Sequence, residues 1–338
     1  MKRGTYLAGL LGLAILTALI VHEGYRDIVR LLEQAGWDLL WIVPFHAVPL
    51  ILDAEGWWVL LRPRDPEGYA TRPFLVWIAT IREAISRLLP VLSIGGEIVG
   101  IRLALLRPLN GAAVAASVIL EVLLTLINQY LFTALGLVLL VTTVSDTALA
   151  GTLFWGLLVS VPVPIALALL LRYGSPFTQI ARFTERLLGD QHRLVATLGV
   201  AAVHLDAEIR ALYQHHGRLW AGLAWQLAAM VVGAFETWLI LHLVDWPVTV
   251  ANAIMLESLW LTIRHLAFFV PGALGVQETG LVLIGGLIGL PSEAAIALSL
   301  AKRFRELVIG LPALASWQWV EFHQLRRKLG DPPVGPRE

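Results

Sequence analysis

Apolar stretches long enough to form helices alternate with short polar turns along most of the chain. A hydrocarbon core about 30 Å thick takes about 20 helical residues, so the longer stretches predict membrane spans. The first, 6–21, is interpreted as an uncleaved anchor. A signal peptide would be followed by a cleavage site of small residues, and none follows this stretch. The further predicted helices are 37–61, 73–89, 96–106, 112–141, 153–171, 219–244, 248–269, 277–290 and 294–320. The pattern predicts an all-α, polytopic integral membrane helical bundle, with residues 1–338 in a single transmembrane domain.

Composition supports a membrane protein. Hydrophobic residues make up 57% of the chain and charged residues 15%, and the mean hydropathy is +0.74. Soluble domains carry about 25% charged residues, and less charge than that leaves apolar side chains facing water. The net charge is zero, which argues against nucleic acid as a partner, and the absence of Cys excludes disulfides and thiol chemistry.

The distribution of Arg and Lys predicts the orientation. The loop at 62–72, the segment 172–218 and the tail at 326–328 are basic, whereas the turns at 142–146 and 245–247 contain neither residue. Basic loops remain on the cytoplasmic side, so we expect both termini in the cytoplasm. The segment 172–218 is predicted to be an amphipathic cytoplasmic linker, helical and lying on the membrane.

Two helical hairpins are interrupted in a similar way. The residues that mark the interruptions are Pro90, Gly95 and Gly96 in the first, and Pro271, Gly272 and Gly275 in the second. In each, a Glu follows seven residues after the Pro, at Glu97 and at Glu278. Pro and Gly expose polar backbone, which is tolerated at membrane depth only inside protein or beside a wet cavity. Two broken or re-entrant helical hairpins are therefore predicted.

The two breaks are entered from opposite sides of the membrane, which is typical of inverted-topology repeats. The first repeat would span about 37–171 with its break at 90–97, and the second about 219–321 with its break at 271–278. The alternative is that turns with Pro and Gly occur by chance in any polytopic protein.

Charged residues inside the apolar stretches indicate a polar interior. A charge at the bilayer centre costs at least about 2.5–3.5 kcal/mol, so these side chains should face one another or water. Arg87, Arg264 and Arg303 are candidate substrate contacts to phosphate or polyol oxygens, and Glu97 and Glu278 are candidate coupling carboxylates. Supporting polar positions are Glu121, Glu257, Lys302, Arg305 and Glu306. Some of these residues could instead form structural ion pairs or extend to an interface.

Pro271-Gly272-Ala273-Leu274-Gly275-Val276-Gln277-Glu278 resembles the Pro-Gly-Gly-Leu-Gly-Val-x-Glu signature of the lysylphosphatidylglycerol synthase transmembrane family. Leu88-Leu89-Pro90 followed by Gly95-Gly96-Glu97 is similar to a second signature. Within that family, Phe45–Leu50 and Ser299–Leu307 are similar to the hopanoid-biosynthesis-associated membrane proteins. The chain departs from the family pattern where Ala273 replaces the second Gly and where Val122 follows Glu121 in place of Arg.

The resemblance implies lipid movement between leaflets of the bacterial inner membrane, with a hopanoid or a phospholipid as the membrane lipid. It leaves open a homo-oligomer or partner proteins of lipid biosynthesis. We predict no cofactor and no metal, because the chain has no phosphate-binding loop motif and its nine His residues are scattered. A lipid-modifying enzyme with Glu97 and Glu278 as acid and base, or an accessory subunit, is the alternative to a transporter.

Overall fold

The computed structural model describes residues 33, 36–89, 95–143, 147–188, 193–267, 270 and 273–330. The predicted anchor at 6–21 and the break residues Pro90, Pro271 and Gly272 lie outside this part of the chain. Within it, every regular element is a helix. The elements are η1 (Gly36–Trp41), α3 (Ile42–Leu61), η2 (Arg62–Arg64), α4 (Arg72–Leu88), α5 (Gly95–Ala104), α6 (Gly111–Thr143), α7 (Thr147–Ser160), α8 (Pro162–Tyr173), α9 (Pro176–Leu188), α10 (Arg193–Tyr213), α11 (His216–Leu243), α12 (Val250–Leu266), α13 (Val276–Leu287) and α14 (Ser292–Gly330).

Four helical segments are long and apolar enough to cross a membrane: Gly36–Arg64, Gly111–Thr143, Phe154–Tyr173 and His216–Leu243. The all-helical prediction is confirmed. The predicted helix 153–171 is in fact covered by two helices, α7 and α8, because Pro162 starts a new helix. The predicted helix 294–320 is longer than expected, since the polar residues after 320 continue α14 to Gly330.

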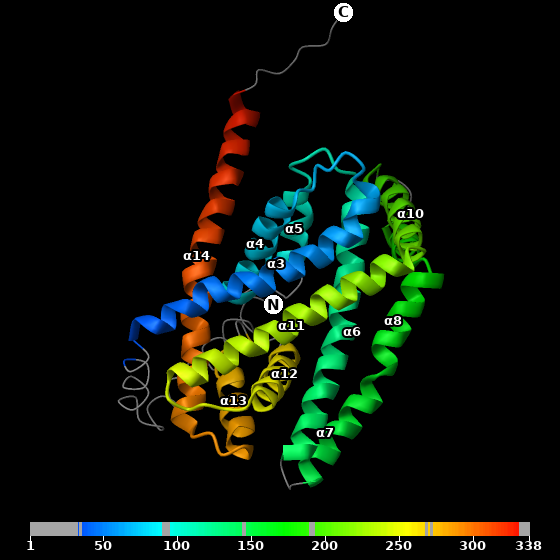
Figure 1. The fold of residues 1–338 in the computed structure, drawn as a ribbon. Helices are drawn as coiled ribbons and strands as arrows, with labels where there is room; N and C mark the ends of the chain where they lie inside the picture. The colour runs from blue at the N-terminus through cyan, green and yellow to red at the C-terminus, as the bar shows by residue number, and fades with distance from the viewer. Residues whose placement is uncertain are drawn as a thin grey trace, which may run out of the picture.

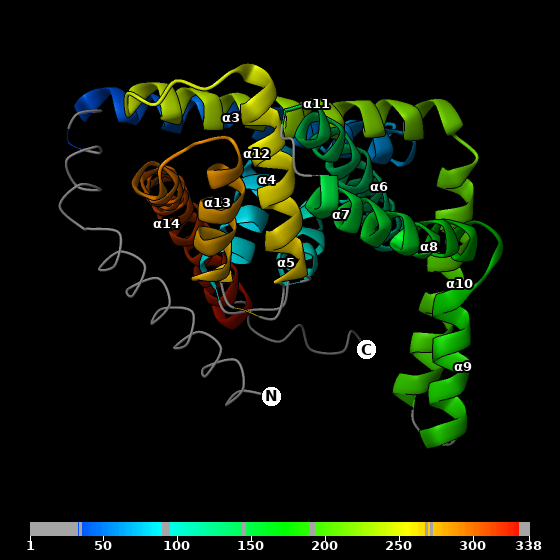
Figure 2. The ribbon, with the colours of Figure 1, turned by 90° about the horizontal axis from the view of Figure 1, so that it is seen from below.

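Helices that are distant in sequence pack against one another. Helices α3 and α11 pack side by side and run in opposite directions (Figure 1). Gly56 and Gly222 lie at this contact: a Cβ added at Gly56 would lie 3.4 Å from the carbonyl oxygen of Gly222, and one added at Gly222 would lie 3.4 Å from Leu60. The long helices α6 and α14 also run in opposite directions, with α6 packed on α12 and α14 packed on α4 (Figures 1 and 2).

The helices before and after the α7–α10 region follow the same order. Each set has a long helix, a 17-residue helix, a short helix of 10 or 12 residues and a second long helix. The short helices begin at 95 and 276, and the long helices after them begin at 111 and 292, so both pairs of starts are 181 residues apart. We refer to residues 36–143 as the first half and to residues 216–330 as the second half.

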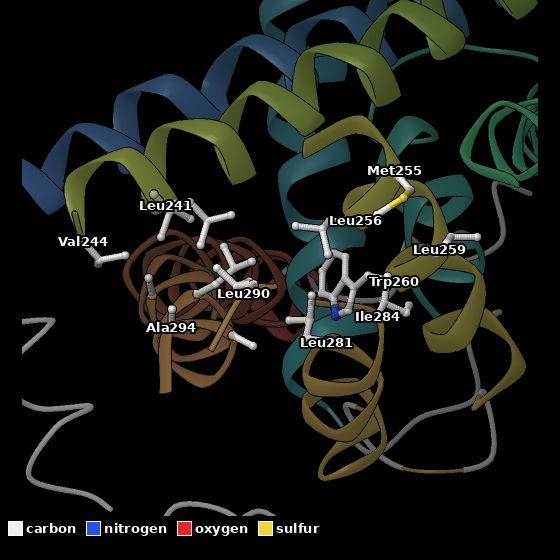
Figure 3. Packing of buried hydrophobic residues seen from close by; sticks show 14 of the residues in the cluster. Leu241, Val244, Met255, Leu256, Leu259, Trp260, Leu281, Ile284, Leu290 and Ala294 are labelled. Atoms are coloured by element: carbon white, nitrogen blue, oxygen red, sulfur yellow. The ribbon is translucent and has the colours of Figure 1, made fainter. Parts of the chain in front are cut away.

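The largest apolar core lies mainly in the second half. Trp260 of α12 lies beside Leu281 and Ile284 of α13 (Figure 3). Leu290 and Ala294, at the start of α14, complete the contact with α11. Within a membrane such a core is stabilised by close packing, hydrogen bonds between helices and lipid entropy, because lipid tails are as apolar as the side chains.

Within the predicted linker 172–218, the structure describes two helices, α9 and α10. Helices α9 and α10 form an antiparallel hairpin that projects away from the other helices (Figure 2). Asp206 of α10 accepts a hydrogen bond of 2.8 Å from the backbone N–H of Thr178, which lies in the first turn of α9. Carboxylates near a helix N-terminus satisfy free backbone donors. Contact of this hairpin with a membrane surface remains a prediction.

Candidate functional site

Both predicted breaks coincide with interruptions of helix. Helix α4 ends at Leu88 and α5 begins at Gly95, while α12 ends at Leu266 and α13 begins at Val276. At 1.5 Å per residue, α5 and α13 are about 15 and 18 Å long, so neither crosses a 30 Å core. Between α12 and α13, Gly275 has φ +75° and Ala273 has φ +49°. Since the left-handed region favours glycine, the Gly at position 273 in the family signature fits the backbone better than this Ala.

The first break carries a three-residue cluster of charges centred on Arg82, in which Arg82 and Glu121 are buried and Glu97 is partly exposed. Arg82 Nη1 donates to both carboxylate oxygens of Glu121, at 3.1 and 3.0 Å, and its Nη2 forms an ion pair with Glu97. The guanidinium also lies 5.1 Å from the ring centre of Trp57. One cation is therefore shared by two carboxylates, Glu97 from α5 and Glu121 from α6, and neutralises the charge of one of them.

Glycine makes room for the Arg82 side chain. A Cβ at Gly100 would lie 2.6 Å from Arg82 Cδ, and one at Gly96 would lie 2.6 Å from the Arg82 carbonyl oxygen. The two glycines are four residues apart and share one face of α5. Gly96, predicted as part of the break, therefore also brings Glu97 into contact with α4.

The second cluster joins the two halves around Glu306 of α14. Its Oε1 atom lies 3.1 Å from Arg264 Nη1, 3.5 Å from Arg87 Nη1 and 3.8 Å from Arg305 Nη2. Arg264 comes from α12 and Arg87 from α4, so three helices supply guanidinium groups to one carboxylate oxygen. Arg87 also pairs with Glu83 at 3.3 Å.

Glu278, at the start of α13, continues this network. Its Oε1 accepts hydrogen bonds from Arg303 Nε at 2.7 Å, Ser299 Oγ at 3.0 Å and Gln277 Nε2 at 3.1 Å. Gln277 Oε1 in turn accepts from Arg264 Nη1 at 3.1 Å. Glu278 is fully buried, and its Oε2 has no hydrogen-bond partner among the residues that the structure describes. A buried acceptor without a partner is costly and suits a site that receives a donor from elsewhere.

Lys302 and Glu257 form a third buried contact. Lys302 Nζ lies 2.6 Å from Glu257 Oε2, which also accepts a hydrogen bond from Thr237. The ammonium lies 4.2 Å from the ring centre of Trp260. This pair links α14 to α12 and is separated from solvent.

A small cavity lies within the second cluster. It has a volume of about 10 Å³ and is lined by His46, Thr80, Glu83, Ala84, Arg87, Arg305, Glu306, Ile309 and Gly310. That volume accommodates about one water molecule. Of the residues predicted as substrate contacts, Arg87 lines this cavity.

The structure brings most of the predicted residues into one network and separates the rest. Arg87, Arg264, Glu278, Arg303 and Glu306 are connected through shared contacts. Glu97 and Glu121 belong instead to the Arg82 cluster. Glu257 pairs with Lys302, and Arg305 bonds Glu236 at 2.9 Å. Glu97 and Glu278 therefore have different partners. An acid and a base that act on one substrate would instead face each other.

Two central residues were missed by the sequence reasoning. Arg82 has the same signal as Arg87, a charge inside a predicted membrane helix, but was not singled out. His46 entered only as part of a family-like stretch, yet it lies 2.8 Å from Glu236 and 3.1 Å from Glu83. Among the described residues, no group of three or more His, Cys, Asp or Glu could hold a metal ion.

A helical bundle with spans of this length and buried ion pairs at broken helices is an integral membrane protein with a polar interior. The family model for the lysylphosphatidylglycerol synthase transmembrane region matches residues 6–313, and the chain belongs to that family. No curated protein and no solved structure matches the chain. Family membership indicates a membrane protein involved in lipid handling.

Proposed function

We propose that this protein moves a polar-headed lipid between the two leaflets of the membrane. The observation that carries the proposal is the convergence of Arg87, Arg264 and Arg305 on one carboxylate oxygen of Glu306. Guanidinium groups are suited to bind phosphate and carboxylate oxygens through several donors at fixed positions. Glu306 occupies the place that an anionic or polyol head group would take, and its displacement would open the network.

Partial exposure supports this assignment. The Arg87 side chain is 21% exposed and that of Arg264 is 11%, whereas Glu306 is 5% exposed. The two arginines therefore reach farther from the interior than the carboxylate they bind. Glu278 Oε2 offers a buried acceptor for a hydroxyl or ammonium group of the same head group.

We propose further that the two halves are inverted-topology repeats with re-entrant hairpins at α4–α5 and α12–α13. The equal separation of 181 residues between the starts of α5 and α13 and between the starts of α6 and α14 supports the repeat. The opposite directions of α3 and α11, and of α6 and α14, support the inversion (Figure 1). Repeats of this kind place a substrate site where their broken helices meet, and they expose it to each side by moving relative to one another.

The finer assignments rest on the sequence. We take a hopanoid as the first lipid to test and a phospholipid as the comparison, and we place the protein in the bacterial inner membrane with both termini cytoplasmic. These proposals rest on the hopanoid-like stretches and on the Arg and Lys distribution.

Purified protein in vesicles with a fluorescent lipid in both leaflets tests the proposal. A quencher added outside removes signal from the outer leaflet, and any further loss measures movement from the inner leaflet. We expect wild-type protein to allow this further loss and Glu278→Gln to slow it, because the amide keeps the volume but binds Arg303 without charge.

Glu321→Gln is the matched control, since Glu321 lies outside the network and forms an ion pair with the exposed Arg102. Equal rates in protein-free and wild-type vesicles for hopanoid and phospholipid alike would contradict the proposal. Chemical change of the lipid without movement would favour the enzyme alternative.

A further inference from the structure

His46 lies where the two halves meet, with a carboxylate at each ring nitrogen. Its Nδ1 is 2.8 Å from Glu236 Oε2 on α11, and its Nε2 is 3.1 Å from Glu83 Oε2 on α4. The His46 side chain is 11% exposed. His46 and Glu83 belong to the first half and Glu236 to the second, so the imidazole forms a bridge between the halves.

Two carboxylate contacts on one ring require two N–H donors. A neutral imidazole has a single N–H, so only an imidazolium can donate to Glu83 and Glu236 at once. The protonated ring is therefore fully satisfied by this geometry. The imidazolium shares these carboxylates with two guanidinium groups, because Glu83 also pairs with Arg87 and Glu236 with Arg305.

Arg305 provides an equally complete arrangement for the neutral ring. Its Nη1 donates to Glu236 Oε2 at 2.9 Å and also contacts His46 Nδ1. When Nδ1 has no proton it can accept from Arg305, while Nε2–H still donates to Glu83. Glu236 then keeps its bond to Arg305 but loses its bond to His46.

The charged groups around the ring come from each helix packed on it. Glu83 and Arg87 belong to α4, Glu236 to α11, and Arg305 and Glu306 to α14. All of these except Glu236 line the cavity of about 10 Å³ beside His46, which has room for one water molecule. A water molecule in this cavity would give a proton of the His46 ring a route away from it.

We infer that His46 is a proton-binding site that bridges the two halves and couples their movement to proton movement. Binding of one proton to Nδ1 turns the imidazole into an imidazolium and adds a hydrogen bond from α3 to Glu236 on α11. Release of that proton to water removes the bond and frees one contact between the halves. This inference rests on the proposed lipid movement and names the ion that drives it.

Vesicles with an imposed pH difference test the coupling. If one proton moves with each lipid, a difference of one pH unit drives up to about a tenfold accumulation of labelled lipid in one leaflet. A pH-sensitive dye inside the vesicles should report proton flux only when lipid moves. His46→Gln should still equilibrate lipid but accumulate none, whereas His323→Gln, on the exposed end of α14, should behave as wild type.

Nuclear magnetic resonance of ¹⁵N-histidine in the membrane-embedded wild type tests the site without any variant. We expect the His46 ring to change protonation state between pH 5 and pH 9. Lipid movement that does not respond to the pH difference, or a His46 ring that keeps one protonation state, would overturn the inference and leave the proposed function intact. No lipid movement under any condition would contradict both.

Discussion

Removal of Lys302 tests whether the charges lie in a sealed interior. Lys302 Nζ and Glu257 Oε2 are 2.6 Å apart, and the two side chains are 3% and 7% exposed. Lys302→Met leaves a buried carboxylate with Thr237 as its remaining hydrogen-bond partner. Breaking a buried pair in this way costs about 3–5 kcal/mol of unfolding free energy.

The chain offers a control with the same geometry. Arg102 Nη2 and Glu321 Oε2 are also 2.6 Å apart, but the Arg102 side chain is 65% exposed. Exposed ion pairs contribute about 0–1 kcal/mol, so Arg102→Met should cost less than about 1 kcal/mol. The two pairs have the same N–O distance and differ strongly in the burial of the cation, so the difference in cost mainly reflects the environment.

A double-mutant cycle completes the test. Glu257→Gln alone leaves the Lys302 ammonium without a counter-charge, and the double variant leaves neither charge. We expect the double variant to lose less stability than the sum of the single variants, with a coupling free energy of about 2–3 kcal/mol. Unfolding by SDS in mixed micelles, followed by Trp fluorescence, gives the free energies. If Lys302→Met costs no more than Arg102→Met, the interior is hydrated and the reasoning is wrong.

Two further predictions concern packing and orientation. A Cβ at Gly136 would overlap Ser258 Oγ and lie 2.9 Å from its Cβ, so Gly136→Ala should cost about 1–3 kcal/mol and Ser258→Gly should restore part of it. A Cβ at Gly233 would have no atom within 4 Å, so Gly233→Ala should stabilise α11 by about 0.5–1 kcal/mol. If Gly136→Ala and Gly233→Ala shift the thermal unfolding temperature equally, the α6–α12 contact is refuted. Single Cys residues at Thr143 and Arg327 should react with impermeant reagents from opposite sides of the membrane, and labelling from one side would contradict the proposed orientation.

The helices follow directly from the sequence, because apolar runs bounded by Pro, Gly and charges leave few alternatives in a membrane. The breaks were also predictable at Gly95 and Gly275, where helices restart. The correspondence of the halves was visible only as two similar motifs. The matching starts of α5 and α13 and of α6 and α14 extend it to whole helices.

The partners of the charges could not be predicted, since they depend on how distant helices cross. His46 contacts residues that are 37, 190 and 259 positions away. Lys302 and Arg303 are neighbours in sequence but point about 100° apart on α14, so they pair with Glu257 and Glu278 on different helices. Spacing along one helix suggests which side chains share a face, but not what faces them.

In the proposed mechanism the two halves move relative to one another to carry lipid across the membrane. A Cβ at Gly310 of α14 would lie 3.4 Å from the Cβ of Ala84 on α4, within reach of a disulfide between the halves. Gly285 and Ala295 offer a control disulfide inside the second half, with a corresponding distance of 3.7 Å. The natural chain has no Cys, so each pair of Cys substitutions forms the one available bond.

Lipid movement measured in vesicles before and after reduction compares the two cross-links. We predict that the oxidised Ala84→Cys/Gly310→Cys protein moves no lipid and recovers when the disulfide is reduced, while the Gly285→Cys/Ala295→Cys protein moves lipid in both states. Equal lipid movement by both oxidised proteins would contradict the claim that the halves must move.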